Sequence, residues 1–408
     1  MKGLNERYEG AERFMLLINA EIFDAASRTF FRGDLLTDGE RIAEVTHGAS
    51  PRRETIPDRE ILDAAGRMVL PGLVDVHTHG RAGGDFVSAD LPTLLAMSES
   101  YLASGVTTLL PTLASAEPDR LRSAVRRIEM AAEAERDPKY AGRLAHFAGA
   151  HLEGRYLNPA KRGAHAPELL APLDADELES ILREVSGVCH VTAALELDGD
   201  GRFLRRALSC GATVGLGHSM ATYEQAMQAF GDGVTSVTHL YNALPPLHHR
   251  AGGAVCAGLL SDAVSCELIC DGFHVAPEMV KLASRLKGRR LVLITDSMEA
   301  TGCADGEYQI AGMPVTVKDG KARTHDGAIA GSTLSLLDGV YNYADFAGVS
   351  FGEAVFAATM APAVEVGLEQ EVGSLEPGKR ADLLVLGSDG KPVQILCGGV
   401  SCLAASAR

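Results

Sequence analysis

Four histidines and two acidic residues stand where apolar segments of this chain end. The segments read Val-Asp-Val-His77-Thr-His79-Gly, Ala-His-Leu-Glu153-Gly, Gly-Leu-Gly-His218-Ser, Val-Thr-His239-Leu and Leu-Ile-Thr-Asp296-Ser. Imidazole and carboxylate groups are ligands of divalent metal ions, and a carboxylate beside such an ion can also transfer protons. Together the five segments indicate a metal centre with a catalytic acid/base.

The His-x-His pair has a defined geometry if it lies in a strand. Residues two apart in a strand face the same way, so His77 and His79 project to one side together with Asp75. If that side is the interior of a barrel, both imidazoles converge near its axis. Taken alone the pair is only moderately specific, because histidines also occur as hydrogen-bonded core or surface residues.

Glu153, His218 and His239 are more informative as a set than singly. Glu153 ends an apolar run, where a carboxylate needs a cation or a donor, and a structural salt bridge is the alternative. A single histidine at a strand end is more often a hydrogen-bonded core residue than a ligand. The three together form a ligand set of two nitrogens and one oxygen that leaves a coordination position open for water, as catalytic zinc-type sites do.

Two further residues suit the chemistry of amide hydrolysis. Asp296 could take a proton from attacking water and deliver it to a leaving nitrogen, whereas its structural alternative is a helix N-cap or a turn. His274, in the segment CDGFH, could donate to a carbonyl oxygen and stabilise the oxyanion, or it could be an ordinary loop histidine.

A Gly-rich loop supplies a candidate anion site. Arg250 lies in LHHRAGG, and the backbone N–H groups of Asn242 and Ala243 are near it in sequence. An arginine with backbone donors suits a phosphate or a carboxylate, although Arg250 could equally be an exposed loop residue.

The elements that must position these residues form a βα repeat. Short apolar segments rich in β-branched residues, such as VTTLLPTL, TVGLGH and LVLITDS, alternate with stretches of helical periodicity. We count eight such units from Met68 to Met298, which predicts a (β/α)8 TIM-type barrel of the α/β class. In that fold reactive residues lie at the C-terminal ends of the strands, where all the candidates fall.

Both ends of the chain have a different pattern. Residues 14–66 and the closing stretch VGSLEPGKRADLLVLGSDGKPVQILCGG indicate short antiparallel strands. We therefore expect a small β-sandwich domain from residues 1–67 and 374–408, and a catalytic barrel from residues 68–373. Residues 305–330 are expected to form hairpin strands, and residues 333–367 amphipathic helices.

Composition limits the class of protein. The net charge of −16 provides no basic surplus for nucleic acid, although local basic residues could still bind an anionic substrate. No apolar run resembles a signal peptide or a membrane span, so we expect no membrane association. Eight cysteines occur without a Cys-x-x-Cys pair, which favours reduced core residues in the cytoplasm.

Seven motifs give the chain a resemblance to a known family. On PGLVDVHTHG, HLEGRYLNPAKRGAH, GHSMATYEQA, THLYNALPPLHHR, DGFHV, ITDSMEATG and AGSTLSLLDGVYN, it resembles the N-acetylglucosamine-6-phosphate deacetylases of the amidohydrolase superfamily. The resemblance covers residue 14 to the tail GKRADLLVL. Many superfamily members share His-x-His, but HLEG with THLYNA and DGFHV is particular to this family. One departure is Arg155, where the family pattern has proline.

The resemblance implies a role for each candidate. Glu153, His218 and His239 match the principal metal ligands, and His77 and His79 a pair that some members use for a second ion. Asp296 matches the catalytic aspartate, and His274 the histidine on the acetyl carbonyl. The substrate contacts implied are backbone groups of Asn242 and Ala243 for the phosphate, His165 for the sugar, and Arg250 for the phosphate in the neighbouring subunit of a homodimer.

The implied reaction is metal-dependent hydrolysis of N-acetylglucosamine 6-phosphate to glucosamine 6-phosphate and acetate, in amino-sugar catabolism. One or two divalent ions per subunit are expected, zinc or iron foremost, with manganese and cobalt also compatible. Three alternatives stay open. The substrate could be the galacto epimer, the chain could be another amidohydrolase such as a cyclic-amide hydrolase, or it could bind a sugar phosphate without catalysis.

Overall fold

The core of the molecule is a barrel of eight parallel strands, seen in a computed structural model that describes residues 14–403. Each strand pairs with the next in chain order, and β10 (His146–Phe147) extends the edge of the second strand. The barrel strands are β6 (Leu73–Thr78), β9 (Val106–Leu113), β11 (Gly149–Glu153), β12 (Val188–Ala193), β13 (Thr213–Leu216), β14 (Ser236–Val237), β15 (Ser265–Ile269) and β16 (Leu291–Ile294). This confirms the predicted (β/α)8 fold class.

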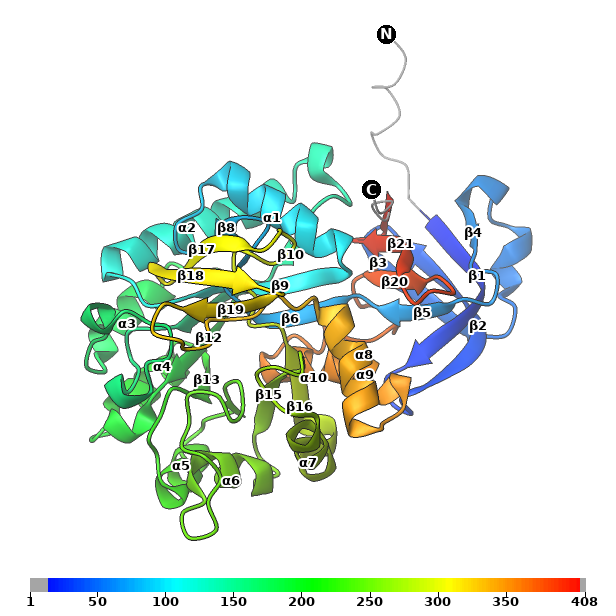
Figure 1. Cartoon of the computed structure of the whole chain (residues 1–408). Coiled ribbons are helices and arrows are strands. Elements are labelled where there is room, and N and C mark those ends of the chain that lie inside the picture. The colour runs from blue at the N-terminus through cyan, green and yellow to red at the C-terminus, as the bar shows by residue number, and fades with distance from the viewer. Residues whose placement is uncertain (1–13, 404–408) are drawn as a thin grey trace.

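Helices cover the outside of the barrel (Figure 1). All eight residues of β9 are buried, as expected of a strand that is covered on both faces. Some helix starts carry side-chain caps: Asp90 accepts from the backbone N–H of Thr93, and Thr222 and Gln225 form a capping box. The helices between barrel strands are α1 (Leu91–Ala103), α2 (Pro118–Ala134), α3 (Ala175–Leu182), α4 (Arg202–Ser209), α5 (Tyr223–Gly231), α6 (Gly253–Leu260) and α7 (Pro277–Lys287).

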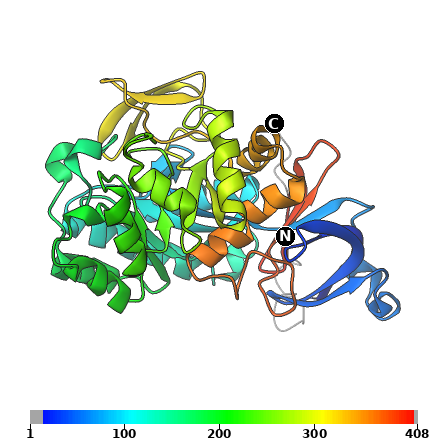
Figure 2. The same ribbon diagram turned by 90° about the horizontal axis from the view of Figure 1, so that it is seen from below.

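The last part of the repeat contains an inserted sheet followed by helices. Strands β17 (Gly306–Ile310), β18 (Met313–Lys318) and β19 (Lys321–Thr324) pair antiparallel, which confirms the hairpins expected over residues 305–330. This sheet, yellow in Figure 2, lies along one side of the barrel. Helices α8 (Leu336–Ala347), α9 (Phe351–Ala357) and α10 (Met360–Glu365) then follow, as expected for residues 333–367.

A second sheet contains both ends of the described chain, and it lies at one side of the barrel (Figures 1 and 2). Its order is β22-β21-β20-β5-β1-β2-β3, with β4 paired to β1, and it encloses a separate apolar core that includes Leu17, Leu35, Val69 and Leu383. The strands are β1 (Phe14–Asp24), β2 (Thr29–Asp38), β3 (Arg41–His47), β4 (Ile61–Asp63), β5 (Met68–Pro71), β20 (Leu383–Leu386), β21 (Pro392–Cys397) and β22 (Val400–Leu403). The domain boundaries after residue 67 and before residue 374 stay a prediction, and residues 1–13 and 404–408 lie outside the described residues.

Closure between the first and last barrel strands places the loop that carries Asp296. The backbone N–H of Asp296 donates to the carbonyl of His77 at 2.9 Å, and that of His79 donates to the carbonyl of Ser297 at 2.8 Å. Two main-chain bonds thus fix the aspartate against the His-x-His pair. Directly after the His-x-His pair, the two-residue strands β7 (Gly80–Arg81) and β8 (Gly84–Asp85) pair antiparallel as a small ribbon.

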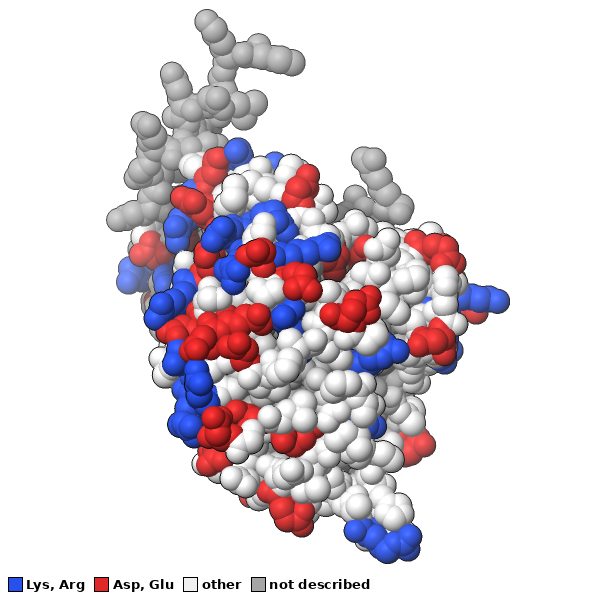
Figure 3. All heavy atoms as spheres, turned by 90° about the vertical axis from the view of Figure 1, so that its left-hand side faces the viewer, with Lys and Arg blue, Asp and Glu red and all other residues white. Residues whose placement is uncertain are grey.

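The surface shows charges of both signs. On the face drawn in Figure 3, Lys and Arg side chains are interspersed with Asp and Glu and form no broad basic area. Among residues 14–403, no helix has the length and apolar character needed to cross a membrane.

Substitution of the buried Tyr101 tests how the barrel closes between its first and last strands. The Tyr101 hydroxyl donates to the carbonyl of Gly80 at 3.0 Å and contacts the hydroxyls of Thr78 and Ser297. Tyr101→Phe removes one member of this buried hydroxyl cluster, while Thr78, Ser297 and the carbonyl of Gly80 keep their contacts with one another. We therefore expect the free energy of unfolding to fall by about 0.5–1.5 kcal/mol in urea denaturation. Tyr140→Phe is the control, because it removes a hydroxyl outside this cluster. Equal effects of the two substitutions would contradict the assignment of Tyr101 to barrel closure.

Candidate metal centre

Glu153 lies at the centre of a group of converging imidazoles at the C-terminal mouth of the barrel. Its Oε1 is 2.9 Å from Nε2 of His239 and 3.2 Å from Nε2 of His218. Its Oε2 is 2.9 Å from Nε2 of His79, while Nε2 of His77 lies 3.5 Å from Oε1. All five side chains are buried, so the structure brings the sequence-predicted ligands together around one carboxylate.

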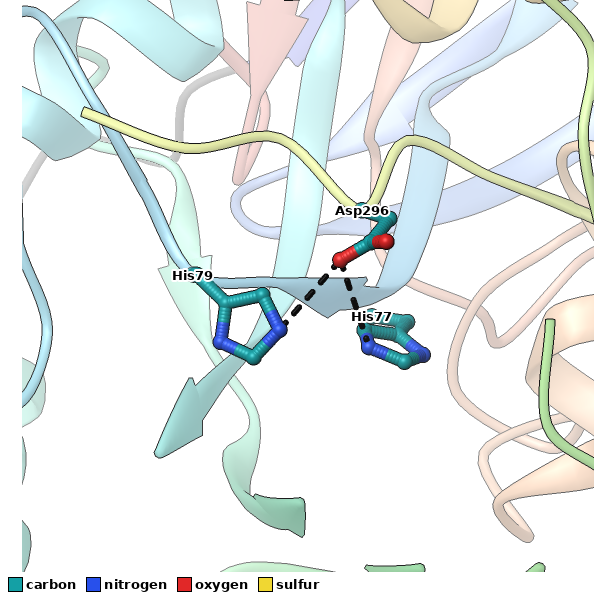
Figure 4. A group of neighbouring side chains, drawn as sticks. All are labelled: His77, His79 and Asp296. Carbon is teal, nitrogen blue, oxygen red and sulfur yellow. Dashed lines mark ion pairs between the residues drawn. The ribbon is translucent and has the colours of Figure 1, made fainter. Parts of the chain in front are cut away.

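Two ligand groups share this mouth. Glu153, His218 and His239 form one, and His77, His79 and Asp296 form the other, and in each group the candidate ligand atoms lie within 4.8 Å of one another. Figure 4 shows Asp296 pointing toward both histidines of the second group. Its Oδ1 is 3.3 Å from Nε2 of His79 and 3.6 Å from Nε2 of His77.

The protonation pattern of the rings fits a bound cation. Nδ1 of His218 donates to the carbonyl of Lys161 at 2.7 Å, so in the neutral ring Nε2 carries a lone pair. That lone pair faces a carboxylate oxygen of Glu153 and lies 3.0 Å from Nε2 of His239. Electron-rich atoms converge in this way when a cation or a proton lies between them. The donor set, two imidazoles and a carboxylate, is one that accommodates Zn²⁺ or other divalent transition metals.

Electrostatics in the site reflect the same concentration of charge. Burial disfavours ionisation of Asp296, but the imidazoles of His79 and His77 outweigh it and lower the pKa of this carboxyl to about 2. Conversely, burial disfavours the protonated form of His79, yet Asp296 and Glu153 raise its pKa to about 9. For His218 burial dominates and lowers the pKa to about 4, which keeps that ring neutral and available as a ligand.

Strained backbone turns three of these side chains into the site. His218, His239 and Asp296 have φ angles of 46°, 28° and 49°, in the left-handed region that residues with a Cβ seldom adopt. Each such residue costs about 1–3 kcal/mol and persists only where surrounding contacts impose it. Each of the three stands two residues after the end of a barrel strand. The strained backbone is therefore concentrated where the candidate ligands and the aspartate enter the mouth.

The mouth opens into a cavity of about 270 Å³ that also collects most of the expected substrate contacts. Its lining includes His165, Asn242, Ala243 and His274. Nδ1 of His274 donates to Oδ2 of Asp271 at 2.6 Å, which fixes the ring. The backbone N–H of Asn242 already donates to the carbonyl of His239 at 2.9 Å, so a phosphate would have to share that donor.

Arg250 lies outside this cavity. It is exposed, and its guanidinium contacts only the neighbouring ring of His249, at 2.9 Å, among its described hydrogen bonds. It is not among the residues that line the cavity of its own chain. The expected phosphate contact of Arg250 therefore stays a prediction.

The backbone conformation at Arg155 excludes the proline that the family pattern has at this position. Its φ is 50°, which the ring of proline cannot adopt. Its backbone N–H donates to Oγ of Ser115 at 2.8 Å, and that hydroxyl contacts Nδ1 of His165 at 2.9 Å. The preceding Gly154 is required because a Cβ there would collide with the backbone of Ser115. The loop after Glu153 thus fixes His165 through a serine.

Sequence reasoning missed the polar residues beneath the mouth. Glu267 accepts from Nδ1 of His77 at 2.9 Å, and Thr295 donates its hydroxyl to Asp75 at 2.6 Å. A third buried group, His190, Glu267 and Glu365, lies below the two ligand groups. The available signal was a charged residue inside an otherwise apolar strand, as in Ser-Cys-Glu267-Leu-Ile.

Comparisons with known proteins agree with this geometry. A model of the amidohydrolase family matches residues 68–402. An N-acetylgalactosamine-6-phosphate deacetylase of Escherichia coli O157:H7 is 37% identical over 84% of this chain and 90% of its own length. An N-acetylglucosamine-6-phosphate deacetylase of Vibrio furnissii is also 37% identical, over 79% of each chain.

A solved structure has the same fold. It is a variant of the N-acetyl-D-glucosamine-6-phosphate deacetylase of Mycobacterium smegmatis in complex with N-acetyl-D-glucosamine-6-phosphate, with a TM-score of 0.84 and 32% identity. The match covers 95% of this chain and 99% of that one. The family resemblance expected from the motifs is confirmed.

Metal binding is tested by thermal unfolding of chelator-treated protein. Zn²⁺ or Co²⁺ at about 100 times its dissociation constant should stabilise the chain by about 2.7 kcal/mol, because only the folded state presents the assembled ligands. His218→Ala removes one ligand and should abolish most of this gain, whereas His325→Ala, at an exposed position, should retain it. Equal stabilisation of both variants would remove His218 from the ligand set.

Proposed function

This chain belongs to the amidohydrolase family, and we propose that it is a metal-dependent deacetylase that hydrolyses N-acetylglucosamine 6-phosphate to glucosamine 6-phosphate and acetate. One observation carries the proposal. Asp296, whose low pKa keeps its carboxylate ionised, lies with His77 and His79 in one of two converging ligand groups, inside a cavity that also presents His274 and His165. That arrangement suits water attack on an amide, and the names of the relatives supply the class of substrate.

We assign the cofactor as one or two divalent ions per subunit, zinc or iron foremost. Glu153, His218 and His239 would hold the principal ion, and His77 with His79 a second one. When bound, such an ion polarises the amide carbonyl and lowers the pKa of water to roughly 7. The remaining chemistry falls to side chains of this chain.

Asp296 is the proposed acid/base. Its low pKa keeps it ionised, so it can accept a proton from attacking water and return that proton to the departing nitrogen. His274 is the proposed partner of the carbonyl oxygen. Because its Nδ1 is held by Asp271, the ring can donate through Nε2 when both nitrogens carry a proton.

His165 is proposed to contact the sugar, and backbone groups of Asn242 and Ala243 the phosphate. Arg250 would complete the phosphate site of the neighbouring subunit in a homodimer, which is consistent with its exposed position away from its own cavity. Such contacts remote from the amide orient the substrate. A cytoplasmic location also belongs to the proposal, supported by eight cysteines without a Cys-x-x-Cys pair.

The galacto epimer is a second candidate substrate, because a relative with 37% identity carries that name. A cyclic-amide hydrolase is less well supported. Its two ions are usually bridged by a carboxylated lysine, whereas Glu153 occupies the centre here and none of the described residues lining the cavity is a lysine. A binding protein without catalysis would have little use for a strained, ionised Asp296.

Acetate release from a substrate panel tests the function. The panel contains N-acetylglucosamine 6-phosphate, its galacto epimer, unphosphorylated N-acetylglucosamine and a cyclic amide, with metal analysis of the same protein. We expect turnover of the first substrate at least tenfold above that of the unphosphorylated sugar and the cyclic amide, because both lack the phosphate contact that orients the amide. The galacto epimer keeps that phosphate and differs in one hydroxyl, so its turnover relative to the first substrate decides between the two candidate sugars.

Asp296→Asn is the matched control for that panel. It should retain the principal ion held by Glu153, His218 and His239 and lower turnover by several orders of magnitude, about 10²–10⁴-fold for the loss of a positioned acid/base. Near-normal turnover would remove Asp296 from this role, and preferred cleavage of the cyclic amide would overturn the deacetylase assignment.

Arg250 and the shared site are tested by mixing variants. Arg250→Ala should raise KM for the phosphorylated sugar with little change in kcat. Co-expression with Asp296→Asn should recover about one quarter of the wild-type rate at low substrate, because half of the dimers then contain one complete site. If Arg250 served its own chain, the mixture would give no gain over the separate variants.

A further inference from the structure

Glu267 is a fully buried carboxylate directly beneath the metal centre. It lies in the middle of β15, and its neighbours Cys266 and Leu268 are also fully buried. Burial of a charged carboxylate in an apolar strand costs several kcal/mol unless donors or a positive charge compensate it. The hydrogen bonds that Glu267 accepts both come from candidate ligands.

One oxygen of Glu267 contacts both ligand groups. Oε2 accepts from Nδ1 of His77 at 2.9 Å, and it also accepts from the backbone N–H of His239 at 3.1 Å. His77 belongs to the group with Asp296, and His239 to the group with Glu153. A single carboxylate oxygen therefore ties the backbone of one ligand to the ring of another.

The contact with His77 sets the tautomer of that ring. A carboxylate only accepts, so the hydrogen of the neutral ring resides on Nδ1, and Nε2 then has the lone pair that a metal ion requires. Nε2 of His77 has no hydrogen-bond partner among the described residues, and it lies 3.5 Å from Glu153 and 3.6 Å from Asp296. An unpartnered, fully buried nitrogen that faces two carboxylates is arranged to bind a cation.

The opposite side of Glu267 faces a second acid. Oε1 of Glu267 and both oxygens of Glu365 are buried without a hydrogen-bond partner among the described residues, and Nε2 of His190 is 3.9 Å from Oε1. Glu365 belongs to this lower cluster but does not contact His77 in the described contacts. Burial and the neighbouring charge of Glu267 raise the pKa of Glu365 well above its usual value, so Glu365 stays protonated. Glu365→Gln is therefore a control that alters the same buried cluster without changing its charge or touching the ligand.

We propose that Glu267 is a positioning residue of the metal centre: by holding Nδ1 of His77, it makes the His77–His79–Asp296 group a tight site for a second divalent cation. The inference rests on the proposed function, because it concerns the same centre. Glu267, which is not a ligand itself, would thus decide whether a second cation binds.

The test is stepwise binding of Co²⁺ to chelator-treated protein, followed by calorimetry and by the visible absorption of the bound ion. Wild-type chain should bind two ions per subunit. Glu267→Gln should weaken the second step by about 10–100-fold, the usual effect of losing a carboxylate that supports a ligating histidine, and should leave the first step close to wild type. Glu365→Gln should leave both steps close to wild type.

Three results would overturn the proposal. They are a single ion bound by wild-type chain, an unchanged second step in Glu267→Gln, and an equal loss in Glu365→Gln. The last result would mean that any change in the buried cluster weakens the second step, whether or not it affects the contact with His77. Thermal unfolding of each metal-free variant checks the fold, and Glu267→Ala repeats the measurement if the glutamine variant unfolds.

The result is separable from the proposed function. If the wild-type chain releases acetate but binds one ion, the role of Glu267 is wrong and the deacetylase function stands. If the chain binds two ions with the help of Glu267 but releases acetate from no sugar phosphate, the proposed function is wrong and the role of Glu267 stands.

Discussion

The structure depends on the burial of one carboxylate, Glu153, among imidazoles at the mouth of the barrel. Its oxygens lie 2.9–3.7 Å from five ring nitrogens. Hydrogen bonds elsewhere place the hydrogen of the neutral His218 and His77 rings on Nδ1, so each ring can direct a lone pair toward the centre. A buried negative charge facing lone pairs is unfavourable unless a cation joins them. Without an ion, protonation of His79 supplies part of that positive charge, because Asp296 and Glu153 raise its pKa to about 9. The fold must hold the remaining groups close together.

Rigid closure of the barrel and local strain provide that support. Main-chain bonds link the segment of Asp296 to His77 and that of Ser297 to His79, so the aspartate cannot drift from the pair. The left-handed conformations of His218, His239 and Asp296 are imposed at the same ends of the strands. Strain of this kind keeps side chains pointing inward, because relaxation of the backbone would have to break the parallel sheet beside it.

The sequence was sufficient to predict the barrel, the antiparallel strands at both ends and the convergence of the ligand candidates. Periodicity determines which face a residue occupies, and the ends of parallel strands meet at one mouth, so His77, Glu153 and Asp296 could be placed together in advance. Glu267 could not, because no local pattern tells which buried ring its strand will face. The exposed position of Arg250 was equally hidden, since a glycine-rich loop can fold toward its own site or away from it.

The residues that line the cavity give a physical reason why a substrate phosphate would be bound by a residue from outside this lining. Its lining combines the histidines and acids of the centre with apolar residues near the inserted sheet, such as Ile310 and Ile329, and the described lining contains neither lysine nor arginine. The interior thus concentrates negative charge, which a divalent ion would balance near Asp296 but not at the far end of a substrate. A phosphate held at that end needs a positive charge that this lining does not provide. The guanidinium proposed for Arg250 of a neighbouring subunit would supply such a charge.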